Sequence, residues 1–402
     1  MDRRGILEYR LFWCHRLCRT LMGIGVFMAA FACCIWTFQM HSDPLTVLLV
    51  ALVAVLPLCL GGLVRRRARG RVAPVAAVAA AMLCGAGLLI RLRYPDIGRM
   101  DLLFLVLTIS VAEALMQISD ERLEQRMMPP RLHDAARRVR SYTVHASGLI
   151  APAVVAALMS AHPYFSVVTV SLSIVLAGAL LSLATGLLSL RRSAPEEKVA
   201  EPEVHGDLSA DVALTFFVLN FCMAMSHGAL LVPMLLSRAT VEALAGVVAW
   251  FFAGLSLGQL FDPLQYFYDN ERRGYAWNSA LALLCMALLF GMARTGWQWN
   301  ACAALGGVLL AAGWGNLEQM RVRRHPRLRL LRAFAWATGL LLGVSCGNVL
   351  EWVMARFGLF SAICARLTGL GEGSGMAMTF VSSGFLSLAV LYVGNRLLRQ
   401  RD

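Results

Sequence analysis

Long apolar runs dominate this sequence, and they leave few folds open to it. The chain has 402 residues, of which 58% are hydrophobic and only 15% are charged. Ordinary globular chains are about 25% charged. Because a helix needs ~20 apolar residues to cross a bilayer, the chain has room for about a dozen spans with short loops. We therefore expect an all-α membrane protein with twelve transmembrane helices.

The apolar runs can be assigned one by one. We place the third span before Ile90 and the other spans at about 20–40, 45–64, 101–119, 143–160, 164–190, 211–236, 241–261, 275–293, 298–316, 333–354 and 374–395. Residues 191–210 are different, because they are rich in proline and glutamate and lack apolar periodicity. This composition predicts a cytoplasmic linker between two six-helix bundles, at 1–190 and 211–402.

The basic residues indicate the orientation of these spans. The net charge is +13, and the arginines cluster at the ends of apolar runs. This pattern favours the positive-inside rule over nucleic-acid binding. With the spans above, 30 of the 37 Lys and Arg residues fall on one side and 7 on the other. The sequence therefore predicts a multi-pass protein of the bacterial inner membrane with both termini in the cytoplasm.

One stretch of the chain occurs twice. Residues 101–159 and about 298–354 each contain an apolar run, a basic joint and a second apolar run. The joints share two tripeptides in order, Leu-Glu-Gln at 123–125 and 317–319, and Pro-Arg-Leu at 130–132 and 326–328. An internal duplication of a membrane bundle is typical of secondary transporters. We interpret the two bundles as pseudo-symmetric.

Several loop and span motifs carry a family resemblance. Gly61-Gly62-Leu63-Val64 leads into the arginines after span two, and Ala151-Pro152 opens span five. Gly228 to Pro233 and the glycines of span eight continue the pattern. With these motifs the chain resembles the major facilitator superfamily, in the branch of enterobactin-type siderophore exporters and macrolide efflux proteins. Arg65 stands where that family has an acidic loop residue.

Polar residues within the spans are candidates for a substrate or proton pathway, since intramembrane charges are costly and tend to be functional. Glu113 and Gln117 share one face of span four, which the resemblance places at the central cavity. Glu113 could bind a proton or a cationic group, or form a structural pair with a neighbouring span. Both interpretations stay open at this point.

Further candidates lie in spans seven and ten. Asn220 and His227 are seven residues apart, so we expect them roughly on one face, as a polar wall or as partners in interhelical hydrogen bonds. Trp314 and Asn316 follow in span ten, where Trp314 is either a substrate wall or a packing residue. For gating at the cytoplasmic loops we select Glu318 and a group of arginines: Arg65, Arg66, Arg67, Arg69, Arg71 and Arg321.

No enzyme motif is apparent in the sequence. We find no phosphate-binding loop, no HExxH, no GxSxG and no zinc-spaced cysteines, and so we expect no catalytic site, metal or cofactor. We expect a monomeric, proton-coupled exporter of a small metabolite such as a siderophore, an antiporter in contact with membrane lipids. The alternatives are a multidrug or antibiotic efflux pump of the same fold, or a non-transporting membrane sensor or assembly partner.

Overall fold

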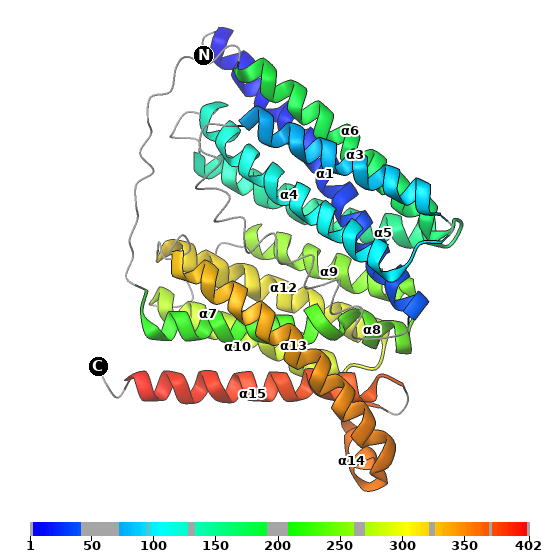
Figure 1. Cartoon of the computed structure of the whole chain (residues 1–402). Helices are drawn as coiled ribbons and strands as arrows, with labels where there is room; N and C mark the ends of the chain where they lie inside the picture. The colour runs from blue at the N-terminus through cyan, green and yellow to red at the C-terminus, as the bar shows by residue number, and fades with distance from the viewer. Residues whose placement is uncertain are drawn as a thin grey trace. The chain divides into compact units, whose positions relative to one another are not determined.

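The described parts of the chain are almost wholly helical. The computed structural model describes residues 3–41, 72–94, 96–127, 133–190, 208–260, 270–320, 326–369 and 372–399 (Figure 1). Every regular element in these ranges is a helix. The chain divides into two compact units, one of Met1–Thr37 with Val53–Pro202, and one of Phe38–Leu52 with Glu203–Asp402.

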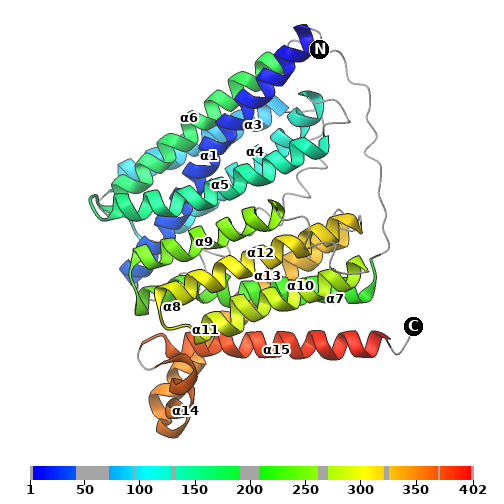
Figure 2. The same cartoon turned by 180° about the vertical axis from the view of Figure 1, so that it is seen from behind.

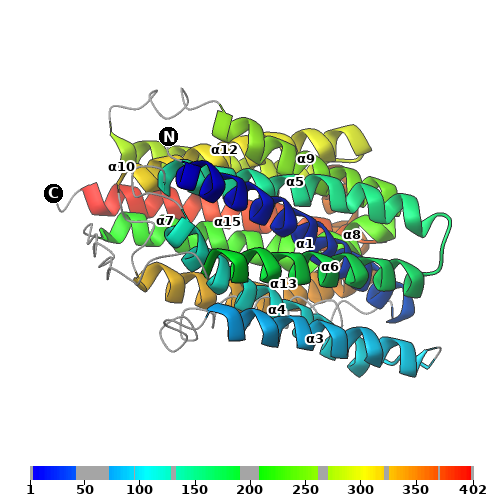
Figure 3. The ribbon, with the colours of Figure 1, turned by 90° about the horizontal axis from the view of Figure 1, so that it is seen from above.

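Unit 1 is a bundle of long helices that pack along their lengths. Its helices are α1 (Arg3–His41, whose last residues belong to unit 2), α3 (Val72–Arg93), α4 (Arg99–Met127), α5 (His133–Met159) and α6 (Tyr164–Leu190). Helix α3 lies against both α4 and α6 (Figure 3). Helix α5 contacts α4 and α6. Two glycines let α1 and α6 approach closely, Gly25 beside Val175 and Gly178 beside Met22.

Unit 2 contains more interruptions. Its elements are α7 (Ala210–Met223), η2 (Ala224–Gly228), α8 (Ala229–Arg238), α9 (Val241–Leu260), α10 (Glu271–Leu283), η4 (Leu284–Leu289), α11 (Phe290–Met292), α12 (Gly296–Gln319), α13 (Pro326–Arg356), α14 (Gly358–Thr368) and α15 (Ser374–Arg399). Helix α12 packs on α9 and α10, while α13 packs on α7 and α15 (Figure 2). The elements η2 and η4 are π-helices, each within one longer apolar run.

Glycines set the closest helix contact in unit 2. A Cβ added at Gly254 of α9 would overlap the carbonyl oxygen of Ala304 in α12, and one added at Gly307 would overlap the carbonyl oxygen of Phe251. Gly258, one turn further along α9, meets Val308 in the same way. Small residues spaced four apart let two membrane helices approach backbone to backbone. The α9–α12 seam is therefore held by dispersion contacts that any side chain would displace.

The all-α membrane fold predicted from hydropathy is confirmed. By length and composition, eight stretches of the described residues can cross a membrane: Tyr9–Met40, Arg138–Met159, Tyr164–Thr185, Ala210–Arg238, Val241–Leu260, Glu271–Met292, Leu330–Arg356 and Ser374–Gly394. The predicted span at 45–64 lies outside the described residues.

Several helices extend beyond the apolar spans that we predicted. The first span was predicted at 20–40, yet α1 starts at Arg3 and continues without a break to His41. Helix α13 starts at Pro326, seven residues before the predicted span at 333–354. Arginine is a good helix former and can extend its charged end toward water. A basic segment therefore ends the apolar run without ending the helix.

Candidate functional site

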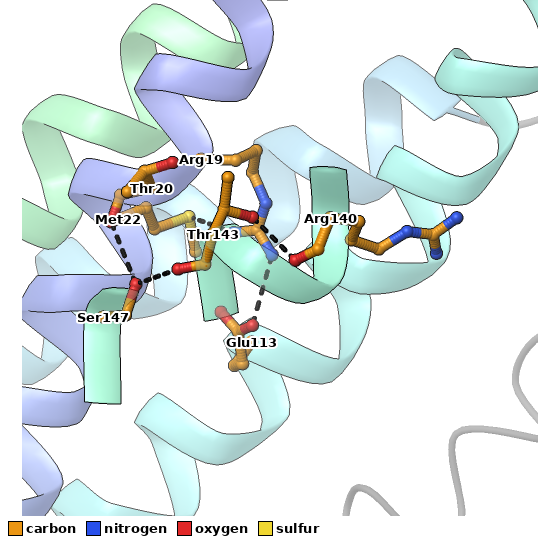
Figure 4. A network of polar contacts seen from close by, with 7 residues as sticks. All are labelled: Arg19, Thr20, Met22, Glu113, Arg140, Thr143 and Ser147. Carbon is orange, nitrogen blue, oxygen red and sulfur yellow. Dashed lines mark hydrogen bonds and ion pairs between the residues drawn. The ribbon is translucent and has the colours of Figure 1, made fainter. Parts of the chain in front are cut away.

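A buried ion pair joins two helices of unit 1. Nη2 of Arg19 in α1 donates a hydrogen bond to Oε1 of Glu113 in α4 over 3.2 Å (Figure 4). The two side chains are only 9% and 16% exposed. Taking two charges out of water costs several kcal/mol per ion (order of magnitude), and the pair offsets this only with good geometry. Such a pair is therefore weak evidence for stability by itself, and it is the candidate site of unit 1.

Neutral polar groups surround the ion pair. Nη1 of Arg19 lies 2.8 Å from the Met22 sulfur. The hydroxyl of Ser147 in α5 donates to the carbonyl of Thr143 at 2.9 Å and approaches the carbonyl of Thr20 in α1 at 3.4 Å (Figure 4). A Cβ added at Gly23 would meet the Ser147 hydroxyl, so α1 and α5 lie close together here. Three helices thus meet at the Arg19–Glu113 pair.

Helix α1 carries more buried polar side chains next to this pair. His15 and Arg16 are 1% and 3% exposed. Nδ1 of His15 lies 3.3 Å from the Ser182 hydroxyl in α6. His15, Arg16 and Arg19 occupy positions i, i+1 and i+4 of one helix, so they share a face. The first half of α1 therefore carries several buried polar side chains within unit 1.

Sequence reasoning missed Arg19. We counted Arg16 and Arg19 among the basic residues before span one, but both lie well inside α1, which starts at Arg3, and Arg19 contacts Glu113 of α4. The available signal was the apolar residues on either side of the two arginines, from Tyr9 onward. Glu113, predicted from the same sequence, does lie at this site. The side chain of Gln117, one turn further along α4, lies outside the described part.

The predicted pair in span seven is separated by the π-helix η2. Asn220 in α7 accepts a hydrogen bond from Nε1 of Trp336 in α13 over 3.2 Å. His227 in η2 instead packs with ring centroids 5.2 Å from Phe290 and 5.1 Å from Phe380. The two residues therefore contact different helices, and the π-helix turn between them, which holds an extra residue, shifts the helical phase.

Both candidates in span ten pack against other residues of unit 2. Trp314 packs against an apolar cluster that includes Leu219, Leu283 and Leu310. Asn316 is completely buried. It lies one turn from Gly313, whose added Cβ would come within 3.6–3.7 Å of Asn278, Ser279 and Tyr275. These positions place Asn316 on the α12 face that packs against α10.

The gating candidates fall largely outside the described residues. This applies to Arg321 and to all of Arg65, Arg66, Arg67, Arg69 and Arg71. Glu318, at the end of α12, is described and is exposed. Within the described ranges, no three His, Cys, Asp or Glu side chains lie close enough together to hold a metal ion.

Comparison with known proteins identifies the fold. No protein-family model matches the sequence, and no curated protein matches it. Solved structures do match. A bacterial homologue of the iron transporter ferroportin in an inward-facing state is 16% identical with a TM-score of 0.69, covering 96% of this chain and 98% of that one. PepTSo2, crystallised as a tetramer, is 11% identical with a TM-score of 0.67, covering 98% and 100%.

A third structure shows the same relationship. The bacterial homologue of the human lysosomal transporter Spinster is 14% identical with a TM-score of 0.61, covering 98% of this chain and 95% of that one. The chain has the major facilitator fold. At identities this low the likeness concerns the fold alone, and the site must be argued from this chain's own residues.

Proposed function

We propose that this chain is a secondary active transporter, a proton-coupled exporter of a small metabolite such as a siderophore. It is expected to work by alternating access as a monomer in the bacterial inner membrane, with both termini in the cytoplasm. The observation that carries the proposal is the buried Arg19–Glu113 pair within unit 1. The major facilitator fold supports it, since the matching structures and this chain cover each other over nearly their whole length.

The proton step is assigned to Glu113. While Glu113 is ionised, its carboxylate accepts the Arg19 hydrogen bond at 3.2 Å. A proton on Glu113 neutralises the carboxylate and so weakens this contact with Arg19. An exporter that exchanges its substrate for a proton must bind the substrate while Glu113 is ionised and release it when Glu113 is protonated. Intramembrane ionisable residues of this kind mark proton relays and substrate paths.

The charge of Glu113 bears on the substrate group that binds here. An ionised carboxylate attracts a cationic or hydrogen-bond-donating group, which then competes with the proton for Glu113. The siderophore class itself rests on the sequence motifs, which resemble siderophore exporters. We propose Gln117, Asn220, His227, Trp314 and Asn316 as further pathway residues. Glu318, with the basic residues Arg65, Arg66, Arg67, Arg69, Arg71 and Arg321, is proposed for the cytoplasmic gate.

A deletion strain tests the substrate and the direction of transport. Cells without the protein should accumulate a secreted metabolite, and the wild-type gene should restore its export. The Glu113→Gln variant should restore little export, because it has no carboxylate to titrate. Asp101→Asn is the matched control. It removes a carboxylate from the same helix about 18 Å away, at an exposed pair where Asp101 lies 3.5 Å from Arg93.

The outcomes separate this proposal from its alternatives. Normal metabolite levels with increased drug sensitivity would favour a multidrug or antibiotic efflux pump. A deletion without effect on metabolites or drugs would favour a non-transporting sensor or assembly partner. Full export by Glu113→Gln would remove Glu113 from the proton step.

A further inference from the structure

Basic residues gather around one short helix of unit 2. The positive-inside count leaves four arginines of this unit on the predicted outer side: Arg238, Arg294, Arg356 and Arg366. Helix α14 connects α13 to α15 and contacts both (Figure 1). Nη1 of Arg238 donates to the carbonyl of Thr368 over 2.9 Å, and Nη2 of Arg294 donates to the carbonyl of Arg366 over 2.5 Å. Two arginines thus cap the C-terminal end of α14, where cations are favoured.

Helix α14 has a buried face and an exposed apolar face. Cys364 and Thr368 are 2% and 1% exposed. Leu359, Ile363 and Leu367, each one turn apart, are 82%, 58% and 36% exposed. An amphipathic helix with such a stripe lies in the membrane interface with its apolar side toward the acyl chains.

Aromatic residues beside α14 favour the same depth. Trp352, at the end of α13, and Phe357, just before α14, are 50% and 56% exposed. The Arg356 guanidinium lies 4.3 Å from the centre of the Trp352 ring. Tryptophan is enriched where membrane meets water, and a cation over its face adds an electrostatic contact. The end of α13 and the start of α14 therefore lie at headgroup level.

An open pocket lies along α14 between two arginines. It has a volume of about 590 Å³ and is lined by Arg294, Arg366 and three residues with little or no side chain, Ala362, Ala365 and Gly369. Ala362 and Arg366 are one turn apart, as are Ala365 and Gly369, so the pocket follows one side of the helix. Two guanidiniums over a small-residue floor suit a phosphate group.

We propose that this pocket binds the phosphate of an anionic phospholipid in the leaflet around α14. The lipid's acyl chains then lie along Leu359 and Ile363. Each basic group that contacts the bound headgroup adds about fivefold to its affinity. The bound headgroup gives a role to arginines that lie close together on the side that the positive-inside rule leaves poor in basic residues.

Native mass spectrometry of the full chain, released from nanodiscs, tests this site. The probe is phosphatidylglycerol, compared with phosphatidylcholine of the same acyl chains. Wild-type protein should retain phosphatidylglycerol preferentially, and Arg366→Gln should weaken that retention about fivefold. Arg356→Gln is the matched control, since it removes the same charge beside α14 but outside the pocket lining. Its retention should stay within twofold of wild type (roughly the scatter of such comparisons).

A second variant keeps both charges. Ala365→Leu fills the pocket floor and should also weaken retention of phosphatidylglycerol, which covers the case that Arg366→Gln does not fold. Equal retention of both lipids, or equal losses for Arg366→Gln and Arg356→Gln, would overturn the proposal. Displacement by soluble glycerol phosphate at the same concentration would also overturn it, and would assign the pocket to a free anion.

Discussion

Arg19 of α1 and Glu113 of α4 form a 3.2 Å ion pair between residues that are 94 positions apart in the chain. The pair lies among the hydroxyls and carbonyls of α1 and α5 (Figure 4). An ion pair of this kind couples two helices electrostatically, and its strength changes when either partner loses its charge. Stability and transport should therefore both depend on the pair, but in different ways.

The energetic coupling of the pair can be measured by a double-mutant cycle. Arg19→Gln and Glu113→Gln should each destabilise the protein by on the order of 3 kcal/mol, because each leaves the other charge buried. The double variant should lose less than the sum, with a coupling of about 1–3 kcal/mol. Thermal unfolding in nanodiscs gives the comparison. The exposed Arg93–Asp101 pair is the control, with an expected coupling below about 1 kcal/mol.

The glycine seam between α9 and α12 should be intolerant of any side chain. Gly254→Ala should destabilise the protein by about 1–3 kcal/mol, because its Cβ has no room beside the Ala304 carbonyl. Gly246→Ala on the same helix is the control, since its Cβ would lie 3.4 Å from the flexible side chain of Asn300. The melting temperatures of both variants check this. Equal melting temperatures would contradict the close approach of α9 and α12.

Glu351 should stabilise the start of α15. Its Oε2 accepts the backbone N–H of Gly375 over 2.7 Å, and its Oε1 accepts that of Gly373 over 3.2 Å. A carboxylate at a helix N-terminus satisfies free N–H groups and interacts favourably with the helix dipole. Glu351→Ala should lower the free energy of unfolding by about 1–2 kcal/mol. Changing the exposed neighbour Glu372 to Ala should lower it by less than about 0.5 kcal/mol.

The environment of His227 separates its packing role from its proposed pathway role. His227→Phe keeps an aromatic ring beside Phe290 and Phe380, so the melting temperature should stay close to that of the wild type. His227→Ala leaves a gap and should cost on the order of 2 kcal/mol. The exposed His162, changed to Ala, serves as the control. The proposed pathway role of His227 predicts that the His227→Phe variant folds normally but transports slowly.

The sequence predicted the fold better than the site. Apolar runs and basic clusters specify a helical membrane bundle, because the bilayer accepts few alternatives. Glu113 could be selected since a lone carboxylate within a span stands out. Arg19 was not selected, because it precedes the most apolar part of the first span, where an arginine also fits the positive-inside rule. Its partner 94 residues away identifies it.

Two further differences have local causes. The π-helix η2 carries no strong sequence signal, so the spacing of Asn220 and His227 was interpreted with the α-helical period alone. Helix α14 was not predicted at all, since its 11 residues are too few to span a membrane and include Arg366. Whether a helix of this length forms depends on what it packs against, and composition does not show this.

Substrate exchange in proteoliposomes tests whether proton binding at Glu113 drives export. Purified protein is reconstituted with the accumulated metabolite inside, and its efflux is measured with and without an inward proton gradient. We expect the gradient to accelerate efflux by the wild type and by Asp101→Asn, while Glu113→Gln shows one slow rate under both conditions. A Glu113→Gln variant whose efflux accelerates with the gradient as much as the wild type would show that Glu113 does not couple export to protons.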